Sequence, residues 1–145
     1  MNQNNELLEY IYQDADMGIK SLNNLLNTLN GKDNKIKNII EDELKNYEKF
    51  QKECKKIMKK NKIEPKAKGV VADISSWMGI KMEMLKDNSD ARVADMLTKG
   101  FTMGVVDLTK KIKSYEKEAD KEILNLAKKL LDFSNKNIEI LKPYL

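Results

Sequence analysis

The chain has 145 residues, with 27 basic and 23 acidic side chains, a formal net charge of +4 and no histidine. This length suits one domain whose core needs neither disulfides nor a metal. Proline is rare, and Leu, Lys, Glu, Ile, Asn and Met dominate, which predicts an all-helical protein. Long apolar runs and the pattern of a signal peptide are both lacking, so we expect a cytoplasmic protein without a membrane span.

The first two helices are predicted at about residues 6–30 and 35–61. Gly31 is expected to adopt a left-handed conformation after the first helix, and Asp33 or Asn34 to cap the second. Pro65 marks the break that follows. Apolar and small residues recur at spacings of three and four along one face of each helix, as in a helical bundle. In the first helix this face comprises Leu8, Ile11, Ala15, Gly18, Leu22, Leu25 and Leu29.

Cys54 falls on the apolar face of the second predicted helix, and it is the only cysteine. An internal disulfide is therefore impossible, and we expect a small buried hydrophobe rather than a reactive thiol. Without histidine, the common Ser/His and Cys/His nucleophile arrangements are excluded. The segment "GKDNK" lacks the glycines and the Gly-Lys-Ser/Thr ending of a phosphate-binding loop. We therefore expect no catalytic site and no bound cofactor.

The rest of the chain predicts helices at about residues 66–86, 90–116 and 120–142, with Ser89 or Asp90 capping the fourth. No glycine or proline separates the last two, so pattern alone would also permit one long helix. An internal repeat argues for a turn. Shifting the chain from residue 17 to residue 103 superposes two Met-Gly pairs and aligns the loop near Gly31 with residues 117–120. We therefore place a turn between Glu116 and Asp120.

Gly18 and Gly104 are the glycines of that repeat. A glycine in the middle of a helix costs roughly 1 kcal/mol relative to alanine, so a pair at matching positions indicates a close approach of two backbones. We predict that the first and fourth helices cross there, near a pseudo-twofold axis. Alternatively, each glycine accommodates a bulky neighbour such as Trp77 or Phe50.

The segments "YIYQDADMGIKSLNNLL" and "FTMGVVDLTKKIKSYEKEADKEI" resemble a group of small bacterial proteins of ferritin-like architecture. The resemblance implies an up-down helical bundle in which two hairpins are related by a pseudo-twofold and joined by a crossover. Here the crossover would contain the extra helix at 66–86.

Di-metal members of that superfamily use a glutamate from each of two helices and Glu-x-x-His from each of the others. The matching positions here read Glu48-x-x-Gln51 and Ser134-x-x-Asn137, so only Glu48 keeps a ligand. The remaining inward carboxylates that could hold a metal are Glu43 and Asp107. Gln51 and Asn137 would be inward polar residues, serving either as a remnant of such a site or as core hydrogen-bonding groups that fix register. We expect the bundle to hold no metal.

Three functions are compatible with this pattern. The first is a non-enzymatic bundle acting through protein association, of a structural or coat-associated type, as a homodimer or with another protein. The second is a carboxylate-based metal-binding protein. The third is a lysine-rich module for an anionic partner, although a single arginine, Arg92, makes nucleic acid an improbable ligand. The lysines concerned, which could equally form a solvated face, are Lys49, Lys52, Lys55, Lys56, Lys59, Lys60, Lys62, Lys66 and Lys68.

Overall fold

The structure is a computed structural model that describes residues 3–65 and 87–145. These residues form four α-helices and a terminal 3-10 turn, with no strand among them. The predicted helix at 66–86, with Trp77, lies outside the described residues. In the part of the chain that is described, no helix is long and apolar enough to cross a membrane. The elements are α1 (Gln3–Thr28), α2 (Lys37–Lys60), α4 (Asp90–Tyr115), α5 (Lys121–Leu141) and η1 (Lys142–Tyr144).

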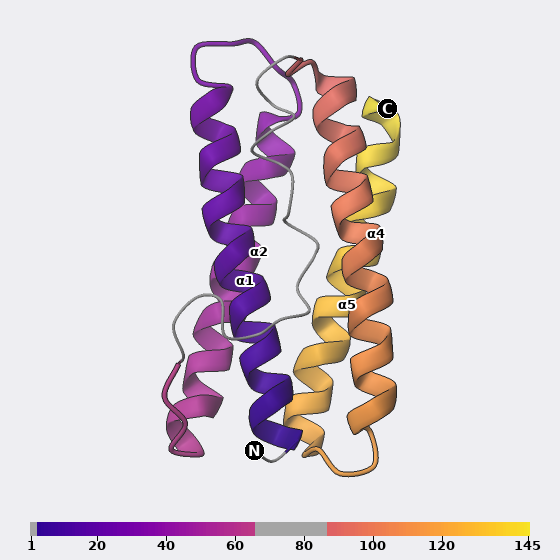
Figure 1. Cartoon of the computed structure of the whole chain (residues 1–145). Helices are drawn as coiled ribbons and strands as arrows, with labels where there is room; N and C mark the ends of the chain where they lie inside the picture. The colour runs from indigo at the N-terminus through magenta and orange to yellow at the C-terminus, as the bar shows by residue number, and fades with distance from the viewer. Residues whose placement is uncertain (1–2, 66–86) are drawn as a thin grey trace.

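The helices pack as two hairpins, α1 with α2 and α4 with α5, and each hairpin is more extensively packed within itself than against the other (Figure 1). At one end of the bundle, Asn34 in the α1–α2 loop donates to Asp90, the first residue of α4. At the other end, the Tyr115 hydroxyl donates to Glu6. Helices α1 and α5 therefore run in one direction and α2 and α4 in the other, so α2 ends and α4 begins at opposite ends of the bundle.

Apolar residues at helical spacing fill the interior, as the pattern predicts; Leu8, Ile11 and Leu22 of α1 are fully buried. Aromatic rings join the two hairpins. The ring of Tyr47 on α2 meets the ring of Phe133 on α5 edge-to-face, with centroids 5.0 Å apart. Such edge-to-face pairs add to the stabilisation that burial alone gives.

Two predictions about residues at the helix ends are confirmed. Gly31 has a φ of 79°, which confirms the predicted left-handed residue after α1. Ser89 is confirmed as the N-cap of α4, where its side chain accepts a hydrogen bond from the Arg92 backbone N–H.

The predicted cap of the second helix is wrong. Ile36, rather than Asp33 or Asn34, occupies the N-cap of α2 and has no side-chain capping bond. The carboxylate of Asp90 instead accepts from the backbone N–H groups of Lys35 and Ile36, at 3.1 and 3.5 Å. The acceptor thus comes from the other hairpin, which local sequence cannot reveal.

The predicted turn between the last two helices is confirmed, because α4 ends at Tyr115 and α5 begins at Lys121. Asp120 is the N-cap residue of α5 but makes no side-chain capping bond. Its backbone N–H donates to the side chain of Asn4, at 2.7 Å. This turn contains no glycine, and the internal repeat was the signal that located it.

The two Met-Gly pairs of the repeat lie in different environments. Gly18 is buried and Gly104 half-buried. Met17 packs against the core, whereas Met103 is 47% exposed. Their helices, α1 and α4, share few contacts. The crossing of the two helices at these glycines stays a prediction.

Candidate functional site

The groove between α2 and α5, called the α2–α5 groove below, is an open depression of about 580 Å³ in the described surface. Helix α2 supplies one wall and α5 the other. Its lining combines apolar, basic, acidic and amide side chains: Ile39, Asp42, Glu43, Lys45, Asn46, Lys49, Phe50, Lys129, Asp132, Phe133, Lys136, Asn137 and Ile140.

Lysines form both edges of this groove. Lys45 and Lys49 lie one turn apart on α2, and Lys129 and Lys136 lie two turns apart on α5; all four side chains are exposed. Two exposed aspartates, Asp42 and Asp132, also line the groove, and Lys129 lies 3.7 Å from Glu53. The edges therefore carry a net positive charge.

Apolar side chains also line the groove between these edges. Phe50 and Phe133 are half-buried, with ring centroids 5.5 Å apart, and Ile140 is 48% exposed. An exposed isoleucine beside two partly exposed aromatic rings gives this groove a hydrophobic surface that solvent reaches.

Glu43 lies at the floor of the groove and is only 1% exposed. Neither of its carboxyl oxygens has a hydrogen-bond partner in the described part of the chain. Burial, together with the charge of Asp42, raises the pKa of Glu43 to about 8. Because a buried charge without a partner is strongly disfavoured, the carboxyl group is neutral at pH 7.

Asn137 lies at the same floor, on the opposite helix, and is 4% exposed. Its side-chain Nδ2 is also without a hydrogen-bond partner within residues 3–65 and 87–145. Buried polar atoms are almost always hydrogen-bonded, so two unpaired groups that line one groove need an explanation.

Further polar residues are also buried in the bundle. Tyr47 is fully buried, and its pKa is raised well above the usual value by burial and by the nearby acidic groups of Asp14 and Glu43. Asp14 is itself 7% exposed. The interior of the bundle therefore contains buried polar side chains beside its apolar core.

The candidate metal ligands fall in three different environments. The inward placement expected for Glu48 is wrong, because its side chain is exposed on α2, one residue and about 100° beyond the buried Tyr47. Glu43 is buried and Asp107 is half-buried on α4. Among the described residues, no group of three or more His, Cys, Asp or Glu side chains is placed to hold a metal ion.

Gln51 and Asn137, the expected inward polar pair, differ in their bonding. Gln51 is half-buried, and its Nε2 donates to Asp16 on α1 at 3.1 Å. This bond joins the two helices of the first hairpin. Asn137, by contrast, has the unpaired Nδ2 described above, so the two residues do not form one site.

Cys54 is confirmed as a buried cysteine. Its Sγ lies 3.2 Å from the carbonyl oxygen of Leu8, and burial raises the pKa of the thiol to about 12. The thiolate is the reactive form, so this cysteine is chemically inert in the folded protein.

The lysine cluster of α2 is exposed over Lys49–Lys62, while Lys66 and Lys68 lie outside the described residues. Two of its members have neighbours on other helices. Lys60 pairs with Glu122 of α5 at 3.1 Å, and the ammonium group of Lys55 lies 5.9 Å from the centre of the Tyr12 ring. Exposed contacts of this kind contribute little stability.

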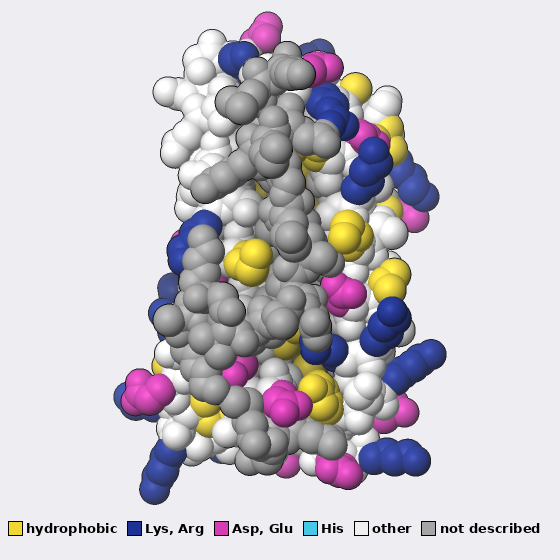
Figure 2. All heavy atoms as spheres, viewed as in Figure 1, with side chains coloured by type: hydrophobic (Ala, Val, Ile, Leu, Met, Phe, Trp, Pro, Cys, Tyr) yellow, Lys and Arg dark blue, Asp and Glu magenta, His cyan; other side chains and the backbone are white. Residues whose placement is uncertain are grey.

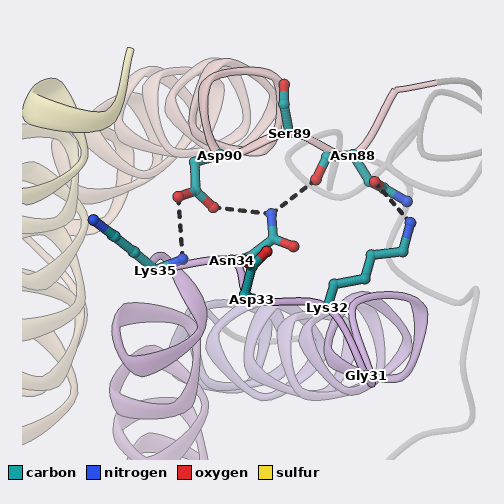
Figure 3. A pocket seen from close by; sticks show the side chains of 8 residues that line it. All are labelled: Gly31, Lys32, Asp33, Asn34, Lys35, Asn88, Ser89 and Asp90. Atoms are coloured by element: carbon teal, nitrogen blue, oxygen red, sulfur yellow. Dashed lines mark hydrogen bonds between the residues drawn. The ribbon is translucent and has the colours of Figure 1, made fainter.

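A second depression, of about 780 Å³, lies between the α1–α2 loop and the start of α4 (Figure 3). Its polar groups bond to one another. Asn34 Nδ2 donates to the Asn88 carbonyl and to Asp90 Oδ1, both at 2.9 Å, and Lys32 Nζ donates to Asn88 Oδ1 at 3.0 Å. These bonds join the two hairpins, and we call this cluster the loop tie.

Over α4, Figure 2 shows hydrophobic side chains at the surface with charged ones between them. Met103 and Val106 of this helix are each 47% exposed. Single exposed apolar residues among charges are common on protein surfaces and do not mark a binding site.

The chain gives no significant match to any family model, curated protein or solved structure with which it was compared.

The sequence pattern did place Glu43 on the inner face of its helix. It did not reveal the groove, because which lysines of α2 and α5 face each other depends on how the two hairpins pack.

Proposed function

We propose that this chain is a non-enzymatic helical bundle of the ferritin-like type that acts through protein association. The connectivity favours this assignment: two hairpins are present, and α2 and α4 run in the same direction, as they do where one crossover joins the halves of a bundle. The proposed binding surface is the α2–α5 groove, and the proposed occupant is an acidic amphipathic helix of a partner protein.

The observation that carries this proposal is the pairing of an apolar groove with two lysine edges. Helices dock into such grooves by their apolar face, with side chains at spacings of three and four as anchors. In this groove Phe50, Phe133 and Ile140 would contact the apolar face of the incoming helix. Lys45 and Lys49 on one side, and Lys129 and Lys136 on the other, would then lie beside its flanks.

The positive charge of the groove edges favours one kind of binding partner over another. A helix with glutamates on both flanks complements the lysine edges, which speeds association and discriminates against basic partners. A second copy of this chain fits less well, because it brings a net charge of +4. An acidic partner of structural or coat-associated type is therefore favoured over a homodimer.

The proposal is tested with a designed 21-residue peptide that has leucines on one helical face and glutamates on both flanks, and with the same peptide carrying lysines in place of glutamates. We expect the acidic peptide to bind and the basic one not to. The variant Lys49→Glu/Lys136→Glu should bind the acidic peptide at least about tenfold more weakly, with the remaining binding less sensitive to salt.

The matched control is Lys110→Glu/Lys113→Glu, which changes the same net charge at exposed positions of α4. It should bind the acidic peptide nearly as well as the unmodified protein. Equal weakening by the two double variants would mean that net charge rather than the groove decides binding. The proposal would then be overturned, as it would by an absence of binding altogether.

A further inference from the structure

The floor of the α2–α5 groove contains two polar side chains, one from each helix. Glu43 comes from α2 and Asn137 from α5, and both are more than nine-tenths buried. The carboxyl oxygens of the first and the Nδ2 of the second are unpaired within the described residues. Apolar side chains at these positions would pack without leaving polar atoms unpaired, so the pair is better explained by a ligand than by packing.

The donors and acceptors of these two side chains determine which hydrogen-bonding groups a ligand needs in order to pair with both. A neutral carboxyl group donates through its hydroxyl and accepts through its carbonyl oxygen, and an asparagine Nδ2 only donates. A primary carboxamide has an acceptor oxygen and a donor NH₂ group. Its oxygen can accept from Asn137 while its NH₂ donates to Glu43, so it pairs both groups at once.

Other ligand groups fit less well. An ammonium or guanidinium group would have to pass the lysine edges of the groove. A carboxylate would place a third acidic group beside Glu43 and Asp42, and its desolvation would be costly. An apolar group would leave both floor residues unpaired.

We propose that the floor of the groove recognises a primary carboxamide, presented by a glutamine or asparagine side chain of the docking helix. This inference rests on the proposed function, since it uses the same groove and names the side chain that gives the partner its specificity. The unpaired atoms are inaccessible to solvent although their residues line the groove, so a neighbouring side chain must turn aside for a ligand to reach them. Ile140, one turn from Asn137 and 48% exposed, is the least restrained apolar residue there.

The test uses three forms of the acidic 21-residue peptide, which carry glutamine, leucine or glutamate at the central position of the apolar face. We expect the glutamine peptide to bind at least about tenfold more tightly than the other two, because only glutamine pairs both floor residues. The advantage of glutamine over leucine should vanish in Glu43→Leu and in Asn137→Leu.

Matched controls are Glu48→Leu and Asn135→Leu, which make the same changes at exposed positions of the same helices. Both should keep the preference for glutamine. Thermal unfolding of every variant verifies that the bundle is folded, and Glu43→Gln provides a second, isosteric change should Glu43→Leu fail to fold. Since Glu43→Gln retains an acceptor oxygen and a donor, we expect it to keep most of the preference.

Propionamide, a small primary amide, tests the floor without any peptide. It should shift the NMR signals of the Asn137 side-chain NH₂ in the unmodified protein and not in Glu43→Leu. If the acidic peptides bind but glutamine gives no advantage, the carboxamide inference is overturned and the proposed function stands. If no peptide binds and propionamide still shifts Asn137, the proposed function is overturned while carboxamide recognition by the floor is supported. If neither binds, both are overturned.

Discussion

The loop tie and the floor of the α2–α5 groove both contain asparagine and acidic residues. Their side chains are hydrogen-bonded in the loop tie, whereas polar atoms at the groove floor lack a hydrogen-bond partner within the described residues. In the loop tie, Asn34 and Asp90 are half-buried and bond to each other and to neighbouring backbone groups. At the groove floor, Glu43 and Asn137 are almost fully buried and unpaired within the described residues.

The difference shows how burial decides the role of a polar side chain. Groups in the loop tie reach solvent, so water can replace a lost partner, and their bonds can be used to hold the hairpins together at a modest gain. Groups at the groove floor are almost fully buried, so a polar atom that is unpaired there lowers the stability of the folded protein. The predictions below compare the two regions by changing one residue at a time.

The largest effect is expected for Glu43→Gln at high pH. The pKa of Glu43 is about 8 in the folded protein, against an ordinary value of 4.5. As pH rises above 4.5, the carboxyl group ionises first in the unfolded chain, so the folded state loses stability until pH 8, above which the loss is constant. Glutamine does not ionise and removes this loss, which amounts to as much as about 5 kcal/mol.

Urea unfolding at pH 5 and at pH 9 measures the effect. The gain in unfolding free energy of Glu43→Gln over the unmodified protein should be small at pH 5 and large at pH 9. The exposed Glu48→Gln serves as the control and should show little change at either pH. A gain that is the same at both pH values would mean that Glu43 ionises normally in the folded protein.

At the same floor, Asn137→Leu should stabilise the free protein by about 1–3 kcal/mol, because it removes a buried donor without a partner. Leucine has the same number of side-chain heavy atoms as asparagine, but its methyl groups are bulkier than the amide, so part of this gain is offset by tighter packing. Unlike the gain at Glu43, this one should not vary between pH 5 and pH 9. A loss of stability in urea unfolding, shared by the smaller Asn137→Ala, would contradict the prediction that removal of an unpaired Nδ2 stabilises the protein.

In the loop tie, Asp90→Ala should destabilise the protein by about 1–3 kcal/mol. The change removes the acceptor for Asn34 Nδ2 and for the backbone N–H groups of Lys35 and Ile36. Asp33→Ala, an exposed position in the same depression, is the control and should change the melting temperature little. If the two substitutions lowered the melting temperature equally, the hydrogen bonds of Asp90 would contribute no more stability than an exposed residue of the same loop.

The smallest effect is expected for Gly31→Ala, in the loop that carries the tie. The residue has a φ of 79°, and a Cβ atom there would meet no heavy atom within 4 Å. The backbone conformation alone is therefore unfavourable for alanine, which should lower the unfolding free energy by about 1 kcal/mol. A loss of several kcal/mol in chemical unfolding would indicate that the whole tie had been disrupted.

Residues whose roles depend on near neighbours in the chain were predictable. Gly31 and Ser89 act within a few positions of themselves, and the hairpin turn after Tyr115 followed from the internal repeat. The apolar faces of the helices, including the buried Cys54, followed from spacing alone.

Residues whose roles depend on the other hairpin were not predictable. Asp90 accepts from the backbone N–H groups of Lys35 and Ile36, just before the first turn of α2, from more than fifty positions away. The capping role predicted for Asp33 or Asn34 is therefore not the one the structure uses. Glu43 was expected to face inward, but a helical pattern cannot say whether an inward acid meets a partner. The groove itself exists only where α2 and α5 lie side by side, and its lysine edges were not apparent from either helix alone.

The arrangement of the contacts has a kinetic consequence. Each hairpin joins helices that are close in the chain, whereas the bonds between Asn34 and Asp90 and between Asn4 and Asp120 link residues 56 and 116 positions apart. Loops of that size close slowly, so we expect each hairpin to form early in folding and the two to dock late. Loss of a late contact chiefly accelerates unfolding, and Asp90→Ala should therefore shorten the lifetime of the native state more than it delays its formation.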